Sequence, residues 1–448
     1  MKKSKDNLKT VAVATLGCKV NQFESASFQS GFEEHGLTVS PFNKPADIYV
    51  INTCAVTAKA AAQSRQLIRK AQRTNPEARV VVTGCYAQIE PQKIEEILSG
   101  PDCIIGNANK HQLIDAVLSE KKEAGPSLRP LDEDYFNDIA LQKEISLLPV
   151  KRFTGRTRAF LKIQDGCNNF CSYCIVPYAR GRSRSLALDK VLNQAVQYAD
   201  KGHREIVITG IHVGHYGIDL DPTLHLFDLL KKLSGLTPEV RYRLSSLEPT
   251  EISNDLLRFM VEADNFMPHL HIPLQSGSDT ILKKMNRRYT VEQFTKKIIR
   301  CKEMVHEAAI GVDVLVGFPG ETEDDFLKTY ELLRSLPITY FHVFPYSKRP
   351  GTPAAKMKNQ VPAKIKDERV AVLRKLDHKK RSNFYGSCLG KVHNVLVESE
   401  RSADGLARGF TDNYIPVHFE ARPEHVNRIV QVKLEKLQDR YVIGTLKK

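Results

Sequence analysis

The sequence predicts an α/β protein of three parts: an N-terminal parallel α/β domain, a partial (βα)6 TIM-like barrel, and a small C-terminal β-barrel. Strand-like and helical stretches alternate along residues 8–118, and they alternate again with a longer period along 151–383. Short alternating strands replace this pattern in 386–448. The length of 448 residues suits about three domains of roughly 150 residues each.

The N-terminal domain repeats one arrangement three times. The segments TVAVATLGC, ADIYVINTC and ARVVVTGC each have the composition of a buried strand, and they end at Cys18, Cys54 and Cys85. Ligand sites of open parallel sheets lie beyond the carboxyl ends of the strands, so these three cysteines are predicted to converge. Three core cysteines are the alternative, since cysteine is commonly buried. Three strands that all end in cysteine favour a site.

The barrel follows a charged, proline-containing stretch, residues 119–150, which is predicted to be a linker with at most a short helix. Six candidate strands come next: TRAFLKIQ, REIVITG, VRYRLSS, PHLHIPLQ, GVDVLVG and YFHVFPY. Polar or glycine-rich loops follow nearly all of them. Because chemistry in such barrels sits at the carboxyl ends of the strands, a cofactor site is expected at that end.

The C-terminal part begins after a basic helix that is predicted to end near Arg381. The stretches HNVLVESE, LARGFTDNYIPVHF and NRIVQVKLEKLQDRYVIGTL have the alternation of short strands in a small barrel. Barrels of this size often bind oligonucleotides. This region is therefore a candidate RNA-binding domain.

The bulk composition favours a nucleic-acid partner. Lysine and arginine outnumber acidic residues 66 to 52, and a basic surface attracts polyanions, although a merely soluble basic protein remains the alternative. The polar start MKKSKDNLKT and the lack of a long apolar run predict a cytoplasmic protein with no membrane segment. Nine cysteines without an export signal point to metal or redox chemistry rather than to disulfides.

The first barrel strand leads into a second cysteine cluster. Cys167, Cys171 and Cys174 have the spacing C-x3-C-x2-C. A closed zinc site needs four ligands, and a histidine would have to complete it, with His203, His212 and His215 as candidates. Three thiolates on a four-iron cluster instead leave one iron open to another ligand, which the pattern favours. The remaining cysteines (Cys103, Cys301 and Cys388) show no comparable pattern and are interpreted as structural.

This spacing at the start of a partial βα barrel resembles the radical S-adenosylmethionine (SAM) superfamily. The resemblance implies that Cys167, Cys171 and Cys174 hold a 4Fe–4S cluster whose open iron binds the amino and carboxylate groups of SAM. Electron transfer from the reduced cluster then cleaves SAM to methionine and a 5′-deoxyadenosyl radical. Tyr173, the aromatic residue before the last cysteine, is expected near the adenine. An electron donor of the flavodoxin or ferredoxin type is an implied partner.

The order of the three domains narrows the resemblance to the methylthiotransferase family. The resemblance rests on the segments TLGCKVNQFES, INTCAVT and TGCYAQ in the N-terminal domain. It rests also on the barrel that follows them and on the small C-terminal barrel, which is like the TRAM domain. The resemblance implies that Cys18, Cys54 and Cys85 hold a second, auxiliary 4Fe–4S cluster. This cluster bears the sulfur, which one SAM methylates, while a second SAM supplies the radical that activates the substrate carbon. The sequence does not indicate the sulfur source.

Three substrates are in use within that family, and LKIQDGCNNFCSYCIVPYARGRSRS is most similar to the threonylcarbamoyladenosine branch. The resemblance thus implies methylthiolation of N6-threonylcarbamoyladenosine at position 37 of tRNA, next to the anticodon. Isopentenyladenosine in tRNA and an aspartate of a small-subunit ribosomal protein are the alternatives. A non-catalytic RNA-binding protein with structural or redox-sensing clusters is the alternative of a different class.

Arginines flank the cysteine cluster on both sides, and they are predicted to clamp phosphates of the tRNA anticodon stem-loop while the target base turns inward. They are Arg152, Arg156 and Arg158 before the cluster, and Arg180, Arg182 and Arg184 after it. A solvated face or ion pairs to the acidic residues of the linker are the alternative.

Three polar side chains of the barrel are candidate SAM contacts. Glu248 and Gln275 end the third and fourth strands, and Asp313 lies within the fifth. Glu248 and Gln275 are expected to hydrogen-bond the ribose or the methionine part of the cofactor, and Asp313 is expected to face the lumen of the barrel. Capping or structural roles are the alternative for all three.

Overall fold

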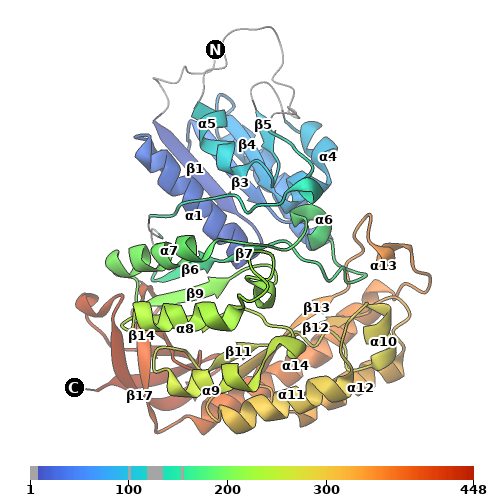
Figure 1. Cartoon of the computed structure of the whole chain (residues 1–448), viewed down its shortest axis with the longest axis vertical. Coiled ribbons are helices and arrows are strands. Elements are labelled where there is room, and N and C mark those ends of the chain that lie inside the picture. Colours follow the sequence, from blue (N-terminus) through green and yellow to red (C-terminus); the bar gives the residue numbers. More distant parts are fainter. Residues whose placement is uncertain (1–8, 99–101, 119–134, 152, 154–155, 448) are drawn as a thin grey trace.

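The computed structural model describes residues 9–98, 102–118, 135–151, 153 and 156–447. The N-terminal domain, coloured blue to cyan in Figure 1, holds a five-stranded parallel sheet in the order β2-β1-β3-β4-β5. Its strands are β1 (Thr10–Thr15), β2 (Thr38–Val39), β3 (Ile48–Thr53), β4 (Arg79–Gly84) and β5 (Cys103–Ile105). All six residues of the central strand β3 are buried, as its continuous apolar run predicts for a sheet that is covered on both faces.

The helices of this domain connect the parallel strands. They are α1 (Lys19–Glu34), α2 (Ala58–Thr74), α3 (Cys85–Ile89), α4 (Pro91–Glu95) and α5 (Leu113–Leu118). Thr57 caps α2, because its side-chain oxygen accepts a hydrogen bond from the backbone amide of Ala60. Cys18 is the residue just before α1, and Cys85 is the first residue of α3. The fold therefore sets these two cysteines at helix starts, directly after strands.

The second part is an open barrel of six parallel strands, which confirms the predicted fold class. They are β6 (Arg158–Lys162), β9 (Glu205–Thr209), β10 (Arg241–Leu244), β11 (His269–His271), β12 (Ala309–Val316) and β13 (Tyr340–Pro345). The sheet β10-β9-β6 meets the sheet β11-β12-β13 through isolated parallel bridges, such as Ser246 with His271. The main helices between the strands are α7 (Leu188–Asp200), α8 (Leu226–Leu236), α9 (Asn254–Glu262), α11 (Val291–Met304) and α12 (Glu323–Ser335).

Shorter elements shape the loops of the barrel. The pair β7 (Gln164–Asp165) and β8 (Arg184–Ser185) is antiparallel and encloses α6 (Val176–Arg180). The helices α10 (Asp279–Lys284) and α13 (Pro353–Lys356) lie in later loops. In the predicted linker, residues 119–134 lie outside the described residues, and the rest holds one short 3-10 turn, Ile139–Leu141.

The C-terminal part is a closed barrel in the order β14-β15-β16-β18-β17. Its strands are β14 (Val392–Arg401), β15 (Ala407–Thr411), β16 (Pro416–Phe419), β17 (Ile429–Gln438) and β18 (Tyr441–Leu446). The preceding helix α14 (Ala363–Ser387) continues beyond the expected end near Arg381, because Tyr385 and the following Cys388 pack into the core of this barrel. Within the described residues, no helix is both long and apolar enough to span a lipid bilayer.

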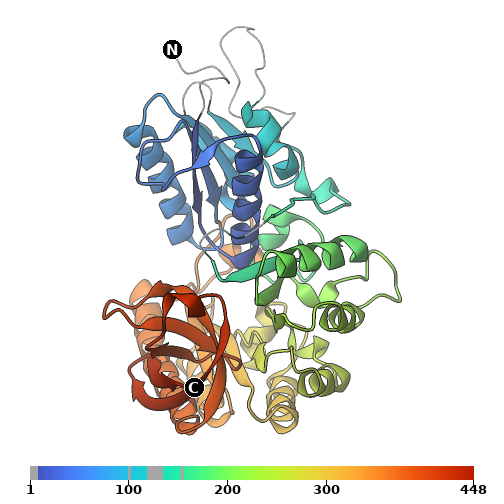
Figure 2. The same cartoon turned by 90° about the vertical axis from the view of Figure 1, so that its left-hand side faces the viewer.

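The C-terminal barrel, red in Figure 2, lies beside the six-stranded barrel and below the N-terminal domain. Arg243 on β10 joins the two barrels: it donates hydrogen bonds to the Glu205 carboxylate at 3.0 Å and to the Asp412 carbonyl at 2.9 Å. Arg158 on β6 donates to Glu398 on β14, also at 2.9 Å. Both guanidinium groups are thereby held by carboxylates, and the three parts of the chain meet around one cavity.

Candidate active site

The central cavity has a volume of about 800 Å³ and is lined by residues from all three parts of the chain. Cys18, Cys54 and Cys85 contribute from the sheet edge of the N-terminal domain. His271, Asp313 and His342 contribute from strands β11, β12 and β13, and Tyr414 contributes from the C-terminal barrel. The N-terminal cysteines therefore open on the same space as the barrel interior.

The loops that carry the N-terminal cysteines are tightly packed. Gly17 has a φ of 94°, and a side chain there would come within 2.9 Å of the Cys54 Sγ. Burial, and next the neighbouring Cys85, raises the pKa of Cys54 to about 12, and burial also raises the pKa of Cys85. None of the nine cysteines forms a disulfide. Three free thiols at one edge of the cavity, two of them with raised pKa values, suit a site where metal cations stabilise the thiolates.

The second cysteine loop, Cys167 to Cys174, has a fixed backbone path. Gly166 has a φ of 73°, and a Cβ atom there would lie 1.9 Å from the carbonyl oxygen of Arg182, so only glycine fits. The Cys174 amide donates to the Cys171 carbonyl at 2.9 Å, which closes a turn. Burial, and next the charge of Cys171, raises the pKa of Cys174 to about 12. This donor set of three thiols likewise fits an iron–sulfur cluster.

Two side chains that sequence reasoning did not assign to a cluster support this loop. Arg287 donates a hydrogen bond to the Cys171 Sγ at 3.4 Å. His212 lies with its Nδ1 3.7 Å from the Cys167 Sγ, while its Nε2 is 2.5 Å from a carboxylate oxygen of Glu251. The contact with Glu251 orients the ring of His212, so that its other nitrogen faces Cys167, one of the three thiols.

The other two candidate zinc ligands, His203 and His215, have neighbours other than the three thiols. The ring of His215 stacks on His212 with 3.7 Å between the ring centroids. His203 is buried elsewhere, beside Phe153, with its Nδ1 3.2 Å from the carbonyl oxygen of Thr157. Within the described residues, neither histidine forms a hydrogen bond with a thiol.

The four predicted SAM contacts fall into two groups. Tyr173 packs among apolar side chains beside the cysteine loop, and Glu248 forms an ion pair with Arg287, the residue that contacts Cys171. Asp313 instead faces the central cavity, where its carboxylate lies 3.0 Å from His271 and 3.2 Å from His342. Burial opposes ionisation of Asp313, but His271 and then His342 lower its pKa well below the usual range.

Gln275 contacts Asp313 through the backbone. It has the left-handed φ of 65°, and its amide donates to the Asp313 carbonyl at 2.8 Å. No hydrogen bond of its side chain is recorded within the described residues, so a SAM contact by Gln275 stays a prediction.

The structure corrects the predicted arginine clamp at two positions. Arg180 is only 1% exposed, and it forms 3.0 Å ion pairs with Glu24 of the N-terminal domain and with Asp165. Arg184 is also buried and donates to the Arg180 carbonyl at 2.6 Å. The helix α6 carries Arg180 into the contact between the N-terminal domain and the barrel, which removes both side chains from the surface.

The other four clamp arginines differ in their surroundings. Arg158 is half-buried and bonded to Glu398 and to the Tyr414 hydroxyl at 2.9 Å. Arg156 is exposed at the rim of the central cavity, and Arg182 is exposed over the ring of Phe170 at 4.6 Å. Arg152 lies outside the described residues. Among the described residues, Arg156 and Arg182 are therefore the two arginines of the predicted clamp that form no ion pair with a carboxylate.

A buried charge network surrounds Arg180, and sequence reasoning missed it. Glu24 on α1 pairs with Lys110 and with Lys162, and Asp165 pairs with Lys162 at 2.7 Å. Burial would raise the pKa of Glu24, but Arg180, Lys110 and Lys162 lower it far below its usual value. Three cations face two carboxylates beside the N-terminal cysteines, so the network carries a surplus positive charge next to the thiols.

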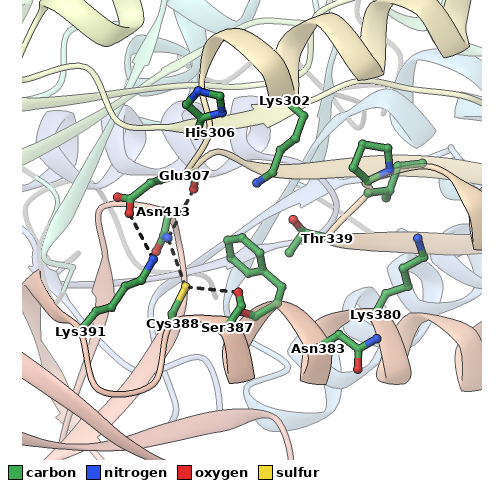
Figure 3. A pocket seen from close by; sticks show the side chains of 13 residues that line it. Lys302, His306, Glu307, Thr339, Lys380, Asn383, Ser387, Cys388, Lys391 and Asn413 are labelled. Atoms are coloured by element: carbon green, nitrogen blue, oxygen red, sulfur yellow. Dashed lines mark hydrogen bonds and ion pairs between the residues drawn. The ribbon is translucent and has the colours of Figure 1, made fainter.

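A smaller pocket of about 410 Å³ lies beside the central cavity (Figure 3). Lys302, Lys380 and Lys391 line it, as does Cys388. It shares three lining residues with the central cavity: Thr339, Phe384 and Asn413. None of the six predicted cluster cysteines lines this pocket. It is a basic side pocket, and the candidate active site remains the central cavity.

Comparison with known proteins places the three parts in known families. Residues 10–106 match the model of the uncharacterized protein family UPF0004, residues 161–333 match the radical SAM superfamily, and residues 386–447 match the TRAM domain. Among solved structures, the radical SAM methyltransferase TsrM from Kitasatospora setae has a TM-score of 0.55 at 16% identity. That alignment covers 79% of this chain and 77% of TsrM, and the likeness concerns the fold.

Several relatives match over nearly the whole chain. The threonylcarbamoyladenosine tRNA methylthiotransferase MtaB of Bacillus subtilis is 40% identical, with 95% of this chain and 94% of that protein covered. MtaB of Aquifex aeolicus is 41% identical, with 94% and 99% covered. The tRNA-2-methylthio-N(6)-dimethylallyladenosine synthase of Pelotomaculum thermopropionicum is 33% identical, with 98% of both covered.

The predicted resemblance is thus confirmed at three levels. The three domain matches follow one another along the chain in the predicted order. The radical SAM match implies SAM and a 4Fe–4S cluster, and the cysteine loop supplies three free thiols at the start of the barrel. The full-length relatives of higher identity carry the name MtaB. The chain belongs to the radical SAM methylthiotransferase family, in the branch of the MtaB proteins.

Proposed function

We propose that this enzyme methylthiolates N6-threonylcarbamoyladenosine at position 37 of tRNA and gives the 2-methylthio derivative. The observation that carries this proposal is the single cavity shared by Cys18, Cys54 and Cys85 and by the barrel interior. A sulfur carrier on the N-terminal cysteines would face a nucleoside held at the barrel mouth. The relatives named for threonylcarbamoyladenosine support this substrate, and those named for dimethylallyladenosine make isopentenyladenosine the alternative.

The proposal assigns two 4Fe–4S clusters to the six cysteines. Cys167, Cys171 and Cys174 would hold the cluster that binds SAM, and Cys18, Cys54 and Cys85 would hold the auxiliary cluster. When bound, these groups supply a radical from SAM and a sulfur for transfer. The proposed domains are residues 8–118 for the auxiliary cluster, 119–150 for the linker, 151–383 for the SAM barrel and 386–448 for the TRAM-like barrel, with α14 shared by the last two.

The chain's own residues orient these sites. Arg287 holds Cys171 through a 3.4 Å hydrogen bond and is itself paired with Glu248, so it fixes one thiol relative to the predicted SAM contacts. Tyr173 would pack on the adenine, and Glu248 and Gln275 would hydrogen-bond the cofactor. Asp313 would orient His271 and His342 toward the substrate cavity.

The nucleosides of cellular tRNA test the proposed reaction. Total tRNA from cells with and without the gene is digested and compared by mass spectrometry. Loss of 2-methylthio-N6-threonylcarbamoyladenosine, with accumulation of its precursor, is the expected result. A loss of methylthio-isopentenyladenosine would move the activity to the alternative nucleoside. No change in any tRNA nucleoside would direct the search to the ribosomal-protein aspartate.

SAM cleavage separates an enzyme from a non-catalytic RNA-binding protein. The reconstituted protein is reduced with a flavodoxin- or ferredoxin-type donor, the partner proposed here, and the formation of 5′-deoxyadenosine is measured. Cleavage is expected. Intact clusters without cleavage under this donor and under a chemical reductant would favour the non-catalytic protein.

The exposed arginines provide a prediction about tRNA binding. The double variant Arg156→Met, Arg182→Met is expected to lower tRNA affinity and to reduce the slope of log K against log salt by about 1 to 2. The reason is that each phosphate contact releases counterions. Filter binding across a salt series measures this slope. Arg334→Met removes an exposed arginine that pairs with Glu331 on α12 and serves as the control. An unchanged affinity in the double variant would contradict the phosphate contacts.

A further inference from the structure

One cation of the central cavity has no hydrogen-bond or ion-pair partner among the residues that the structure describes. Four of the arginines that line the cavity (Arg158, Arg180, Arg243 and Arg381) each pair with a carboxylate: Glu398, Glu24, Glu205 and Asp377, respectively. Lys19, the first residue of α1, lines the same cavity. Among the described residues, its ammonium group has no hydrogen bond and no ion pair within 4.0 Å. Lys19 is therefore the unneutralised lysine of this site.

Lys19 lies in the wall of the central cavity, at the start of α1. Tyr414 of the C-terminal barrel and Arg158 and Arg243 of the six-stranded barrel line the same cavity. The Tyr414 oxygen accepts a hydrogen bond from Arg158, so its own hydroxyl hydrogen is available to a further acceptor. Lys19 is half-buried, and a partly desolvated cation beside paired arginines costs free energy unless an anion reaches it. The site is thus prepared for an anionic group.

The two candidate nucleosides differ in the charge of the group on N6. The threonyl group of N6-threonylcarbamoyladenosine carries an α-carboxylate, which is ionised at neutral pH because its pKa is roughly 3.5. The isopentenyl group carries no charge. In adenine, C2 and C6 both flank N1, so the substituent on N6 lies along the edge that receives the methylthio group. A residue that recognises this substituent must therefore lie close to the sulfur carrier, and Lys19 directly follows Cys18.

We propose that Lys19 binds the carboxylate of the threonylcarbamoyl group and selects this nucleoside over those with uncharged N6 substituents. The inference rests on the proposed function. Arg156 is the other cavity cation without a carboxylate partner, but it is exposed at the rim and donates to the Gln22 side chain at 3.0 Å. Its position suits a backbone phosphate, whereas that of Lys19 suits the modified base.

The test pairs a variant with a changed substrate. Two anticodon stem-loops are prepared, one with N6-threonylcarbamoyladenosine and one with its carboxyl group converted to the methyl ester. Their dissociation constants and their methylthiolation rates are measured with the reconstituted wild-type enzyme and with Lys19→Met. The wild type is expected to prefer the acid by about 10- to 100-fold, the range of a charge-assisted hydrogen bond. Lys19→Met is expected to lose this preference and to treat the ester as the wild type does.

Controls separate substrate recognition from damage to the protein. Lys70→Met removes an exposed lysine on α2 of the same domain and is expected to keep the preference for the acid. Lys19→Arg is expected to restore most of it. Iron content and SAM cleavage are expected to stay at wild-type levels in all variants.

Two outcomes would overturn the inference. A wild-type enzyme that binds acid and ester equally well needs no carboxylate contact. A Lys19→Met enzyme that still prefers the acid uses another residue for it. An enzyme that methylthiolates neither stem-loop, but acts on isopentenyladenosine, would refute the proposed function itself, so the two failures are distinguishable.

Discussion

Replacing Cys54 with alanine is expected to abolish methylthiolation of tRNA while the cleavage of SAM continues. Cys54 lines the central cavity together with Cys18 and Cys85, and no other thiol is recorded among the lining residues that the structure describes. Two thiolates cannot hold the proposed auxiliary cluster as three do, because each coordinates its own iron. Iron analysis and Mössbauer spectra should show the loss of about one of two clusters. The 5′-deoxyadenosine assay should remain positive.

A complementary variant removes a ligand of the other proposed cluster, the one that binds SAM. Cys171→Ala removes the thiol that Arg287 contacts, and it is expected to abolish both SAM cleavage and methylthiolation while the auxiliary cluster remains. Cys301→Ala is the matched control: this cysteine is fully buried in α11 and should cost stability without the loss of either cluster. If Cys54→Ala retained both clusters and full methylthiolation, the assignment of the N-terminal cysteines would be wrong.

The fold was largely predictable because its signals are local. Continuous apolar runs such as the one in β3 mark buried strands wherever they occur, and their alternation with helices implies a parallel sheet. The end of α14 was not predictable in this way. Its last turns carry Tyr385 into the core of a barrel whose strands come later in the chain, and that contact, rather than helix propensity, extends the helix.

The two kinds of site residue differed in how far the sequence could indicate them. The cysteines were predictable because cluster ligation requires a particular side chain at strand ends and at close spacing. Arg180 was not, because its partner Glu24 lies 156 residues away in the chain. Arg182, two residues later, is exposed, so a basic run does not tell which members face water. Arg287 meets Cys171 from 116 residues farther along the chain, and Lys19 shares the central cavity with residues of the other two domains, so neither role has a local sequence signal.

Replacing Arg180 with methionine is expected to lower the free energy of unfolding by about 3 kcal/mol and to reduce occupancy of the auxiliary cluster. Arg180 bonds to Glu24, Asp165 and Asn21 across the contact between the N-terminal domain and the barrel, and those acceptors would stay buried without it. The cost lies at the lower end for a broken buried pair, since Lys110 and Lys162 still neutralise the carboxylates. Thermal unfolding of the reconstituted enzyme and iron analysis measure both effects.

The variant Arg182→Met is the control for Arg180→Met. Arg182 is exposed and stacks on Phe170, so its loss should leave the unfolding midpoint within a degree or so of wild type while it lowers the salt dependence of tRNA binding. Arg180→Met should lower the unfolding midpoint and leave the salt dependence of tRNA binding unchanged, because a buried guanidinium releases no counterion from RNA. A stable Arg180→Met enzyme with a reduced salt slope would show that this arginine leaves its buried network to contact tRNA.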